Sequence, residues 1–448
     1  MDIDITEKDT SPIPRTAPPP AALAAAALLL ALPCRGQVGD VEPPAVGPDR
    51  ALELFHRHSL ELRAARADLR AEAGRASQAA AYPNPSASVL REDLGRGGDD
   101  YSENSFTLRQ TLEWPGRTLA RSRASSRRRS AARAAFRSDS LGLVLGVWRA
   151  YLGAAEAERR VAVLERVADV FREAVEDAGI RREEGDLSGY ELRRLKLERA
   201  RLEQALAAAR IERDAARREL AARVAPGSDT VGLATRGLPE GRPPPVDREA
   251  AVTAALGRPS VAAGRRSARA AEAEASAARL RRLPDLQLTG GYKTQSDDFD
   301  GAVLGVSLSL PIFDRKSGEV QAAEARASAA ETRLDLQRRR IRGEVLRALD
   351  RYRSVRRRSR VVGGDLLAPS EDLLEIARTA YDAGEMELVG LLDGADAFRE
   401  ARLTALELRA ELWLAYRELV RAAGGRIDDD GDAAGADAPA GNGGGDRR

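Results

Sequence analysis

The sequence contains an internal duplication, and this duplication limits the folds that the chain can adopt. A proline-containing break at Pro83-Asn84-Pro85 recurs as Leu283-Pro284-Asp285, and a glycine turn at Gly185–Ser188 recurs at Gly384–Glu387. Matching landmarks are about 200 residues apart, a period that indicates duplication of a whole structural unit. Each unit reads as helix, strand, strand, long helix, turn and helix.

The repeats define the expected organisation of the chain. We expect one structural repeat at residues 47–224, a Pro/Gly-rich linker at 225–246 and a second structural repeat at 247–424. Residues 1–36 are expected to be an export segment. Residues 425–448 are rich in Asp, Gly and Ala, a composition typical of a disordered tail.

Composition excludes several classes of protein. Aromatic residues are 4% and charged residues 32% of the chain, which favours long helices over a compact enzyme core. One cysteine and two histidines leave no thiolate metal cluster and no histidine-based catalytic site, so we expect no enzyme activity, no cofactor and no resident metal. Lys plus Arg number 72 and Asp plus Glu 70, a balance that argues against nucleic acid as a partner.

Long helices are expected in both repeats. Arg117–Glu184 and Lys316–Ala383 are each predicted as one rod about 100 Å long. Apolar residues recur along the first rod at steps of three and four, as at Val144, Val147 and Trp148. Such a stripe on a charged rod must pack on neighbouring helices to be stable.

Four segments alternate apolar and polar residues as strands do: Ser86–Glu92, Phe106–Leu112, Leu286–Lys293 and Leu304–Leu310. Alternation gives a sheet one apolar and one wet face, which fits a half-buried sheet of a soluble domain or a membrane wall with polar residues inward. In the membrane interpretation, the residues expected to face lipid, with Leu308 near the midplane, are Leu304, Val306, Leu308 and Leu310. Ser307 and Ser309 should then face a lumen.

The N-terminal segment indicates export. Ala21–Leu32 is apolar but too short to span a bilayer as a helix, and it fits the hydrophobic part of a secretory signal. Cys34 follows directly, so two interpretations stand: a lipidated cysteine, or an ordinary signal with an incidental cysteine.

Four strands cannot close a barrel, and open sheet edges do not survive in lipid. A membrane wall would therefore need several copies of the chain. Two copies give about 8 strands with an interior filled by side chains, and three give about 12 strands with a lumen.

The order of these landmarks resembles the outer-membrane efflux protein family typified by the trimeric TolC channel. The resemblance is carried by YPNPSASVLRED (82–93), LRQTLEWPGR (108–117), VSLSLPIFDRKSGEVQAAEAR (306–326) and AYDAGEMELVGLLDGADAFREAR (380–402). The tract RAARADLRAEAGRASQAAAYPNP is similar to the cobalt-zinc-cadmium and copper efflux branch.

The resemblance implies a mainly α-helical homotrimer with a small 12-stranded membrane β-barrel on a long periplasmic helical tunnel. It implies an outer-membrane exit duct for small molecules or metal ions. The implied partners are outer-membrane lipid, a periplasmic adaptor (membrane fusion) protein and an inner-membrane pump of the resistance-nodulation-division type. The alternative is a soluble or periplasmic coiled-coil scaffold, which explains the helices and the charge balance but not the strands or the signal.

The family's tunnel closes near the hairpin turns, and the resemblance places a gate there. Tyr381 and Asp393 match the family's motif, while Gly390 stands where the family often has a second acidic residue. A ring of carboxylates could therefore come from Asp393 alone or be supplemented by Asp396, and it would attract cations. Arg194 matches Asp393 in the first repeat. We expect Arg194 to pair with a neighbouring carboxylate, and Tyr381 to add a hydrogen bond across helices.

The two turns are the expected docking surface for the adaptor, because they lie farthest from the strands. Their glycines allow the chain to reverse. For Asp393 the competing interpretation is a solvated charge on a helix surface. The turn residues are Gly185, Asp186, Leu187, Ser188, Gly384, Glu385, Met386 and Glu387.

Overall fold

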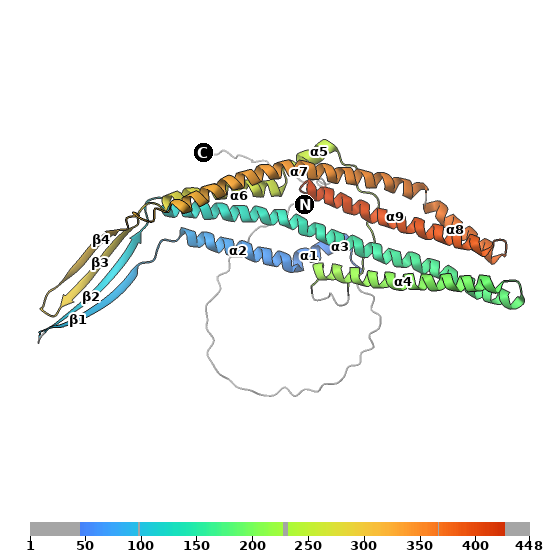
Figure 1. Cartoon of the computed structure of the whole chain (residues 1–448), viewed down its shortest axis with the longest axis horizontal. Coiled ribbons are helices and arrows are strands. Elements are labelled where there is room, and N and C mark those ends of the chain that lie inside the picture. The colour runs from blue at the N-terminus through green and yellow to red at the C-terminus, as the bar shows by residue number, and fades with distance from the viewer. Residues whose placement is uncertain (1–44, 97–98, 227–231, 366, 426–448) are drawn as a thin grey trace, which may run out of the picture.

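The computed structural model describes residues 45–96, 99–226, 232–365 and 367–425. The expected export segment, Cys34 and the tail after residue 425 lie outside these ranges. The molecule is elongated, with a sheet at one end and two helical hairpins at the other (Figure 1). No helix in the described ranges is both long and apolar enough to cross a membrane.

The order of elements in the first half recurs in the second. The first half consists of α1 (Pro48–His58), α2 (Leu60–Ala80), β1 (Ser86–Arg96), β2 (Asp99–Leu112), α3 (Arg117–Glu184) and α4 (Gly189–Val224). The second half consists of α5 (Arg248–Leu256), α6 (Pro259–Leu280), β3 (Leu286–Gln295), β4 (Asp300–Leu308), α7 (Ser317–Asp365), α8 (Leu367–Asp382) and α9 (Leu388–Ala422).

Local sequence signals set several helix boundaries. The Ser59 hydroxyl caps the start of α2 by accepting a hydrogen bond from the amide of Leu62. The Asp247 carboxylate caps the start of α5 by accepting hydrogen bonds from amides of that helix. Pro259 begins α6, where its missing N–H costs nothing. The left-handed glycines Gly116 and Gly185 bracket α3, whose observed bounds are those predicted from the sequence.

The second rod differs from the expectation. Instead of one helix over Lys316–Ala383, two helices are described: α7 ends at Asp365 and α8 begins at Leu367, and residue 366 lies outside the described ranges. Gly363, Gly364 and Pro369 cluster at this point. Glycine and proline are the residues least compatible with a helix interior, which fits the division of the second rod into α7 and α8.

The strands form one antiparallel sheet in the order β1-β2-β3-β4. β1 extends four residues past the predicted Glu92, and β2 begins at Asp99, seven residues before the predicted Phe106. β4 runs from Asp300 to Leu308, so Ser309 and Leu310 lie beyond the sheet. Pro311, which has no amide hydrogen, follows at once and cannot continue the ladder.

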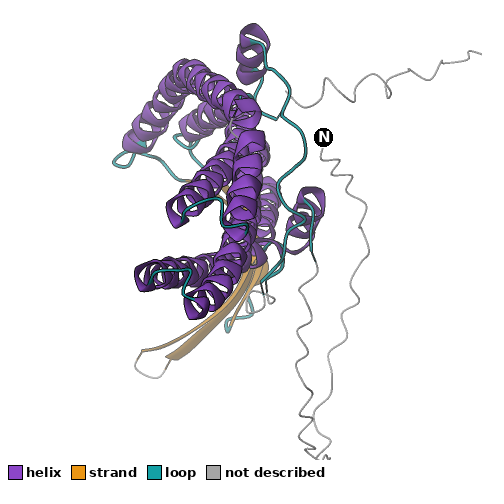
Figure 2. Ribbon diagram, turned by 90° about the vertical axis from the view of Figure 1, so that its right-hand side faces the viewer, coloured by secondary structure: helices purple, strands orange, loops and turns teal. Residues whose placement is uncertain are grey.

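The helices form a curved layer (Figure 2). Several separate hydrophobic cores lie between them. One core surrounds Tyr151 and Phe55 midway along α3, and another packs Tyr352 against Leu412 between α7 and α9. A third joins both hairpins around Phe171 and Phe398. This third core holds α3, α4, α8 and α9 together at the end of the molecule farthest from the sheet.

Candidate gate and docking surfaces

The first hairpin reverses between α3 and α4 with its backbone hydrogen bonds satisfied. Gly185 has φ of 89°, and the amides of Gly185 and Asp186 donate to the carbonyls of Arg182 and Arg181 at 3.3 and 2.8 Å. Ser188 and Glu191 form a reciprocal capping box at the start of α4. Leu187 is buried, whereas Gly185 and Asp186 are exposed. The polar part of this turn is therefore presented at the end of the molecule.

The second hairpin turns in a similar way between α8 and α9. Gly384 has φ of 75°, and the amides of Glu385 and Met386 both donate to the Ala380 carbonyl, at 2.8 and 3.1 Å. Glu387 is the N-cap of α9 but makes no side-chain capping bond.

Gly390 lies directly under the side chain of Met386. A Cβ atom added to Gly390 would lie 2.6 Å from the Met386 sulfur. Any acidic side chain at this position would have to displace Met386. This contact gives a packing reason for glycine at the position where the family often has a second acidic residue.

Tyr381 is enclosed between the two hairpins. Its side chain is 2% exposed, and its hydroxyl has no hydrogen-bond partner among the described residues. Burial raises the pKa of this hydroxyl. Arg181 of α3 instead donates to the Tyr381 backbone carbonyl at 3.2 Å and lies over the Tyr381 ring. Arg181 therefore links the first hairpin to the second, a role that sequence reasoning missed.

The structure does not bring Asp393, Asp396 and Arg194 together within one chain, although all three are close to the turns in sequence. Asp393 is exposed on α9, and Asp396 forms an exposed pair with Arg399 at 2.8 Å. Arg194 is half-buried on α4. Within the described part of the chain, neither Asp393 nor Arg194 forms an ion pair.

A carboxylate-rich cluster joins α3 to α8 close to Tyr381. Arg378 pairs with Glu173 at 2.5 Å and lies 3.9 Å from Asp382. Burial, and secondly the negative charge of Asp177, raises the pKa of Asp382. Protonation of Asp382 would therefore remove its repulsion by Asp177 of the first hairpin.

A second set of contacts holds α3, α8 and α9 together farther from the turns. Glu371 of α8 pairs with Arg166 of α3 and with Arg402 of α9, and both arginines lie against the ring of Phe398. Burial, followed by the charge of Arg166, lowers the pKa of Arg402. Sequence periodicity assigns such arginines to solvated faces, so only the packed helices reveal these links.

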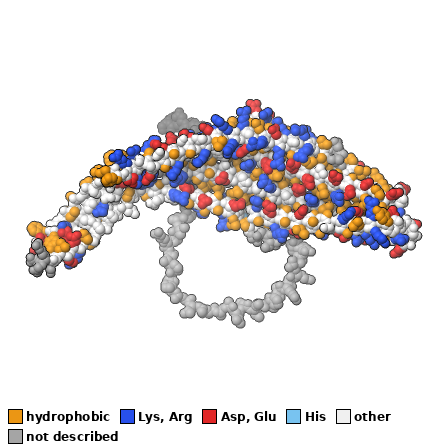
Figure 3. All heavy atoms as spheres, viewed as in Figure 1, with side chains coloured by type: hydrophobic (Ala, Val, Ile, Leu, Met, Phe, Trp, Pro, Cys, Tyr) orange, Lys and Arg blue, Asp and Glu red, His pale blue; other side chains and the backbone are white. Residues whose placement is uncertain are grey.

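The two faces of the sheet differ sharply. Val306 pairs in register with Leu288, and Leu304 pairs through Gly290 with Leu108, so these side chains share one apolar face. Leu304 is 86% exposed and Val306 72% exposed within the chain. Charged side chains are dense over the helices and sparse over most of the strands (Figure 3).

The opposite face of the sheet is mainly polar, although Leu90, Leu94 and Val303 also lie on it. Ser307 lies beside Gln287, Ser88 is 2.7 Å from Thr107, and Lys293 pairs with Glu103 at 2.7 Å. Leu304 is the central residue of β4, whereas Leu308 is its last residue, next to the helices. Leu308 therefore lies at the end of the strand and Leu304 at its centre, so in a membrane wall Leu304 would be the residue closer to the middle.

Exposed apolar side chains also gather at the hairpin ends. Ile180 and Tyr190 are 58% and 72% exposed on the first hairpin, and Val389 is 45% exposed on the second. These three side chains are exposed within the chain and are available for contact with another protein.

Comparisons with known proteins agree with this architecture. The family described as Outer membrane efflux protein matches residues 251–425. The cobalt-zinc-cadmium resistance protein CzcC of Cupriavidus metallidurans is 26% identical over 386 residues, which cover 85% of this chain and 91% of that protein. The nickel-cobalt-cadmium resistance protein NccC of Alcaligenes xylosoxydans xylosoxydans is 27% identical over 277 residues, 60% of this chain and 62% of the relative.

Solved structures share the fold at lower sequence identity. The Campylobacter jejuni CmeC outer membrane channel superposes with a TM-score of 0.72 at 18% identity, covering 84% of this chain and 85% of that structure. The similarity extends over both repeats, because it spans most of each chain.

Proposed function

We propose that the chain is a member of the outer membrane efflux protein family and acts as a conduit rather than an enzyme, serving as the exit duct of a tripartite system that exports divalent transition-metal ions. The names of CzcC and NccC associate both relatives with resistance to cobalt and cadmium, which supports a metal cargo. Family membership favours the conduit over a coiled-coil scaffold.

The observation that carries the proposal is the two-faced sheet with open edges. β1 and β4 each have one neighbouring strand in the described chain, so each leaves an edge unpaired. Three copies would join these edges into a barrel of about 12 strands, wide enough for a lumen. The apolar face would contact lipid and the polar face would line the lumen, as in other outer-membrane barrels.

The helices would continue this wall as a periplasmic tunnel that narrows at the hairpins. Asp393, exposed close to the second turn, would contribute three carboxylates around the axis, supplemented by Asp396. Arg194 and Tyr381 would help hold the closed state, with Arg181 joining the two hairpins of each copy. A carboxylate ring in a narrow bore attracts cations.

The hairpin ends would dock a periplasmic adaptor that connects the duct to an inner-membrane pump of the resistance-nodulation-division type. The polar turn residues and the exposed Ile180, Tyr190 and Val389 support this placement. Cysteines introduced at Ser188 or Glu387 should crosslink to the adaptor in cells. A cysteine at Asp298, in the turn between β3 and β4, is the matched control. Crosslinks at Asp298 with none at the turns would contradict the orientation.

Metal export tests the cargo. The chain should be expressed together with its adaptor and pump in cells that lack their own duct, and cellular zinc, cobalt and cadmium measured by mass spectrometry. We expect the metal content to fall only when all three components are present. Unchanged metal content, together with export of an organic dye, would overturn the metal assignment but not the conduit.

A further inference from the structure

A large cavity lies where the helices meet the sheet. Its volume is about 1190 Å³, and residues of α2, α3, α6 and α7 line it. These helices pack side by side in the order α2, α3, α6, α7. A cavity lined by the first and the last helix of such a layer opens on its concave face. We call this cavity the neck basin.

Charged side chains surround a small-residue floor in the neck basin. Ala124, Ala277 and Ala323 lie among its lining residues, and Gly318 adds a position without a side chain. The lining includes five arginines and three glutamates, which leaves an excess of two positive charges. These residues are Arg75, Arg121, Arg128, Arg281, Arg326, Glu113, Glu274 and Glu319.

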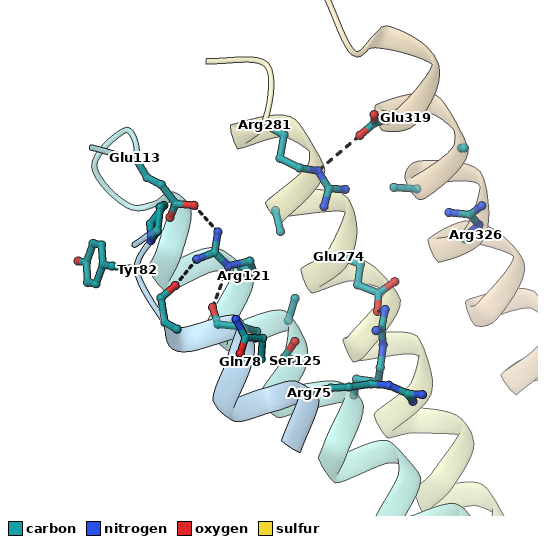
Figure 4. Close-up of a pocket in the computed structure, with 18 of the residues that line it drawn as sticks. Arg75, Gln78, Tyr82, Glu113, Arg121, Ser125, Glu274, Arg281, Glu319 and Arg326 are labelled. Atoms are coloured by element: carbon teal, nitrogen blue, oxygen red, sulfur yellow. Dashed lines mark hydrogen bonds and ion pairs between the residues drawn. The ribbon is translucent and has the colours of Figure 1, made fainter. Parts of the chain in front are cut away.

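The arginines differ in how many of their donors are already used. Most donors of Arg121 are already used, because it pairs with Glu113 and donates to the carbonyls of Ala79 and Ala81 at 2.8 Å. Arg281 contacts Glu319 of the neighbouring helix at 3.6 Å (Figure 4). A guanidinium has five N–H donors, so an arginine with one such contact retains several.

Two more arginines have spare binding capacity. Arg128 of α3 pairs with Glu274 of the neighbouring helix α6. Arg326 is exposed on α7 and forms no ion pair with any described residue. Arginine forks bind phosphate and carboxylate oxygens in pairs, which distinguishes this site from one for a monovalent halide.

We propose that the neck basin binds small multivalent oxyanions, phosphates or carboxylates, through Arg128, Arg281 and Arg326. The inference rests on the proposed function, because three walls that close into a tube must each be concave inward, which turns the basin toward the lumen. Threefold repetition then forms a positively charged ring where the helical tunnel meets the barrel. Such a ring concentrates anions and repels cations, the opposite of the carboxylate ring expected at the hairpins.

The test uses the full-length protein in planar bilayers of phosphatidylcholine, with inorganic pyrophosphate as the probe. Pyrophosphate should block the conductance when it is added from the sheet side. Arg326→Glu should raise the half-blocking concentration by roughly tenfold or more, the loss expected for one hydrogen bond to a charged group. Arg326→Gln should have a smaller effect in the same direction.

Arg338→Glu is the matched control, because Arg338 is also exposed on α7 and does not line the neck basin. It should leave the half-blocking concentration unchanged. Adding phosphatidylglycerol to the bilayer should leave the pyrophosphate sensitivity unchanged, because lipid headgroups do not reach a basin that faces the lumen. Lost sensitivity would contradict this orientation of the basin.

Two failures have different meanings. Absence of any conductance would contradict the proposed function. A conductance that pyrophosphate does not block, or that Arg326→Glu and Arg338→Glu alter equally, would overturn the anion site alone. Heat-modifiable oligomers on gels verify that each variant has assembled.

Discussion

Leu304 distinguishes a lipid-facing sheet from a water-facing one. Its side chain is 86% exposed in the chain and central in β4, so replacing it removes little packing within one copy. If that face met water, Leu304→Arg would change stability by no more than about 0.5 kcal/mol, as for an ordinary surface substitution. If it meets lipid near the midplane, the same change should cost about 2–4 kcal/mol.

Val303→Arg is the matched control on the adjacent residue. Val303 lies on the polar face, and its partner in register is Gly291, which has no side chain to obstruct a longer one. We expect it to assemble nearly as well as the unmodified protein. Leu308→Arg, at the helical end of β4, should cost only about 0–1 kcal/mol because it lies near the interface.

Urea unfolding in lipid vesicles measures these differences, and the yield of heat-modifiable oligomers provides a second readout. The expected order of stability is Val303→Arg, then Leu308→Arg, then Leu304→Arg. Equal stability of Leu304→Arg and Val303→Arg would refute the assignment of the two faces.

Three further predictions concern the hairpins. Asp393→Ala should weaken block of the reconstituted channel by multivalent cations, and unchanged block would make Asp393 a plain surface charge. Arg194→Ala and Arg181→Ala should each raise the resting conductance, because each removes a charge expected to hold the closed state; two silent variants would argue against this gate. The raised pKa of Asp382 means that its stabilising contribution is present below the ordinary value of 3.8 and is lost as pH rises through the raised value. Asp382→Asn should therefore reduce the loss of thermal stability between acidic and neutral pH, and an identical pH dependence in both proteins would contradict this reasoning.

Periodicity and turn residues predicted the elements well where the signal was local. The bounds of α3 follow from two glycines and an apolar stripe between them, and both hairpin turns follow from Gly185 and Gly384. The strands were predicted too short at their far ends because Asp93 and Asp99 resemble loop residues. In a sheet with a polar face such residues still pair, as Asp93 does with Ser102.

The contacts that assemble the site could not be read from the sequence. Arg181 and Tyr381 are 200 positions apart, and an arginine on an exposed helix face normally indicates only solvation. The packing of Met386 on Gly390 depends on the course of one turn. The neck basin needs four helices side by side, so its arginines acquire a shared surface only in the folded chain.

The number of copies in the assembled protein tests the central claim most directly. The protein should be extracted from the outer-membrane fraction in mild detergent, and its mass determined by native mass spectrometry. Three copies are predicted, because three four-stranded sheets are needed to close a barrel of about 12 strands around a lumen. A single copy, or a pair that leaves no lumen, would contradict the account of this chain as an exit duct.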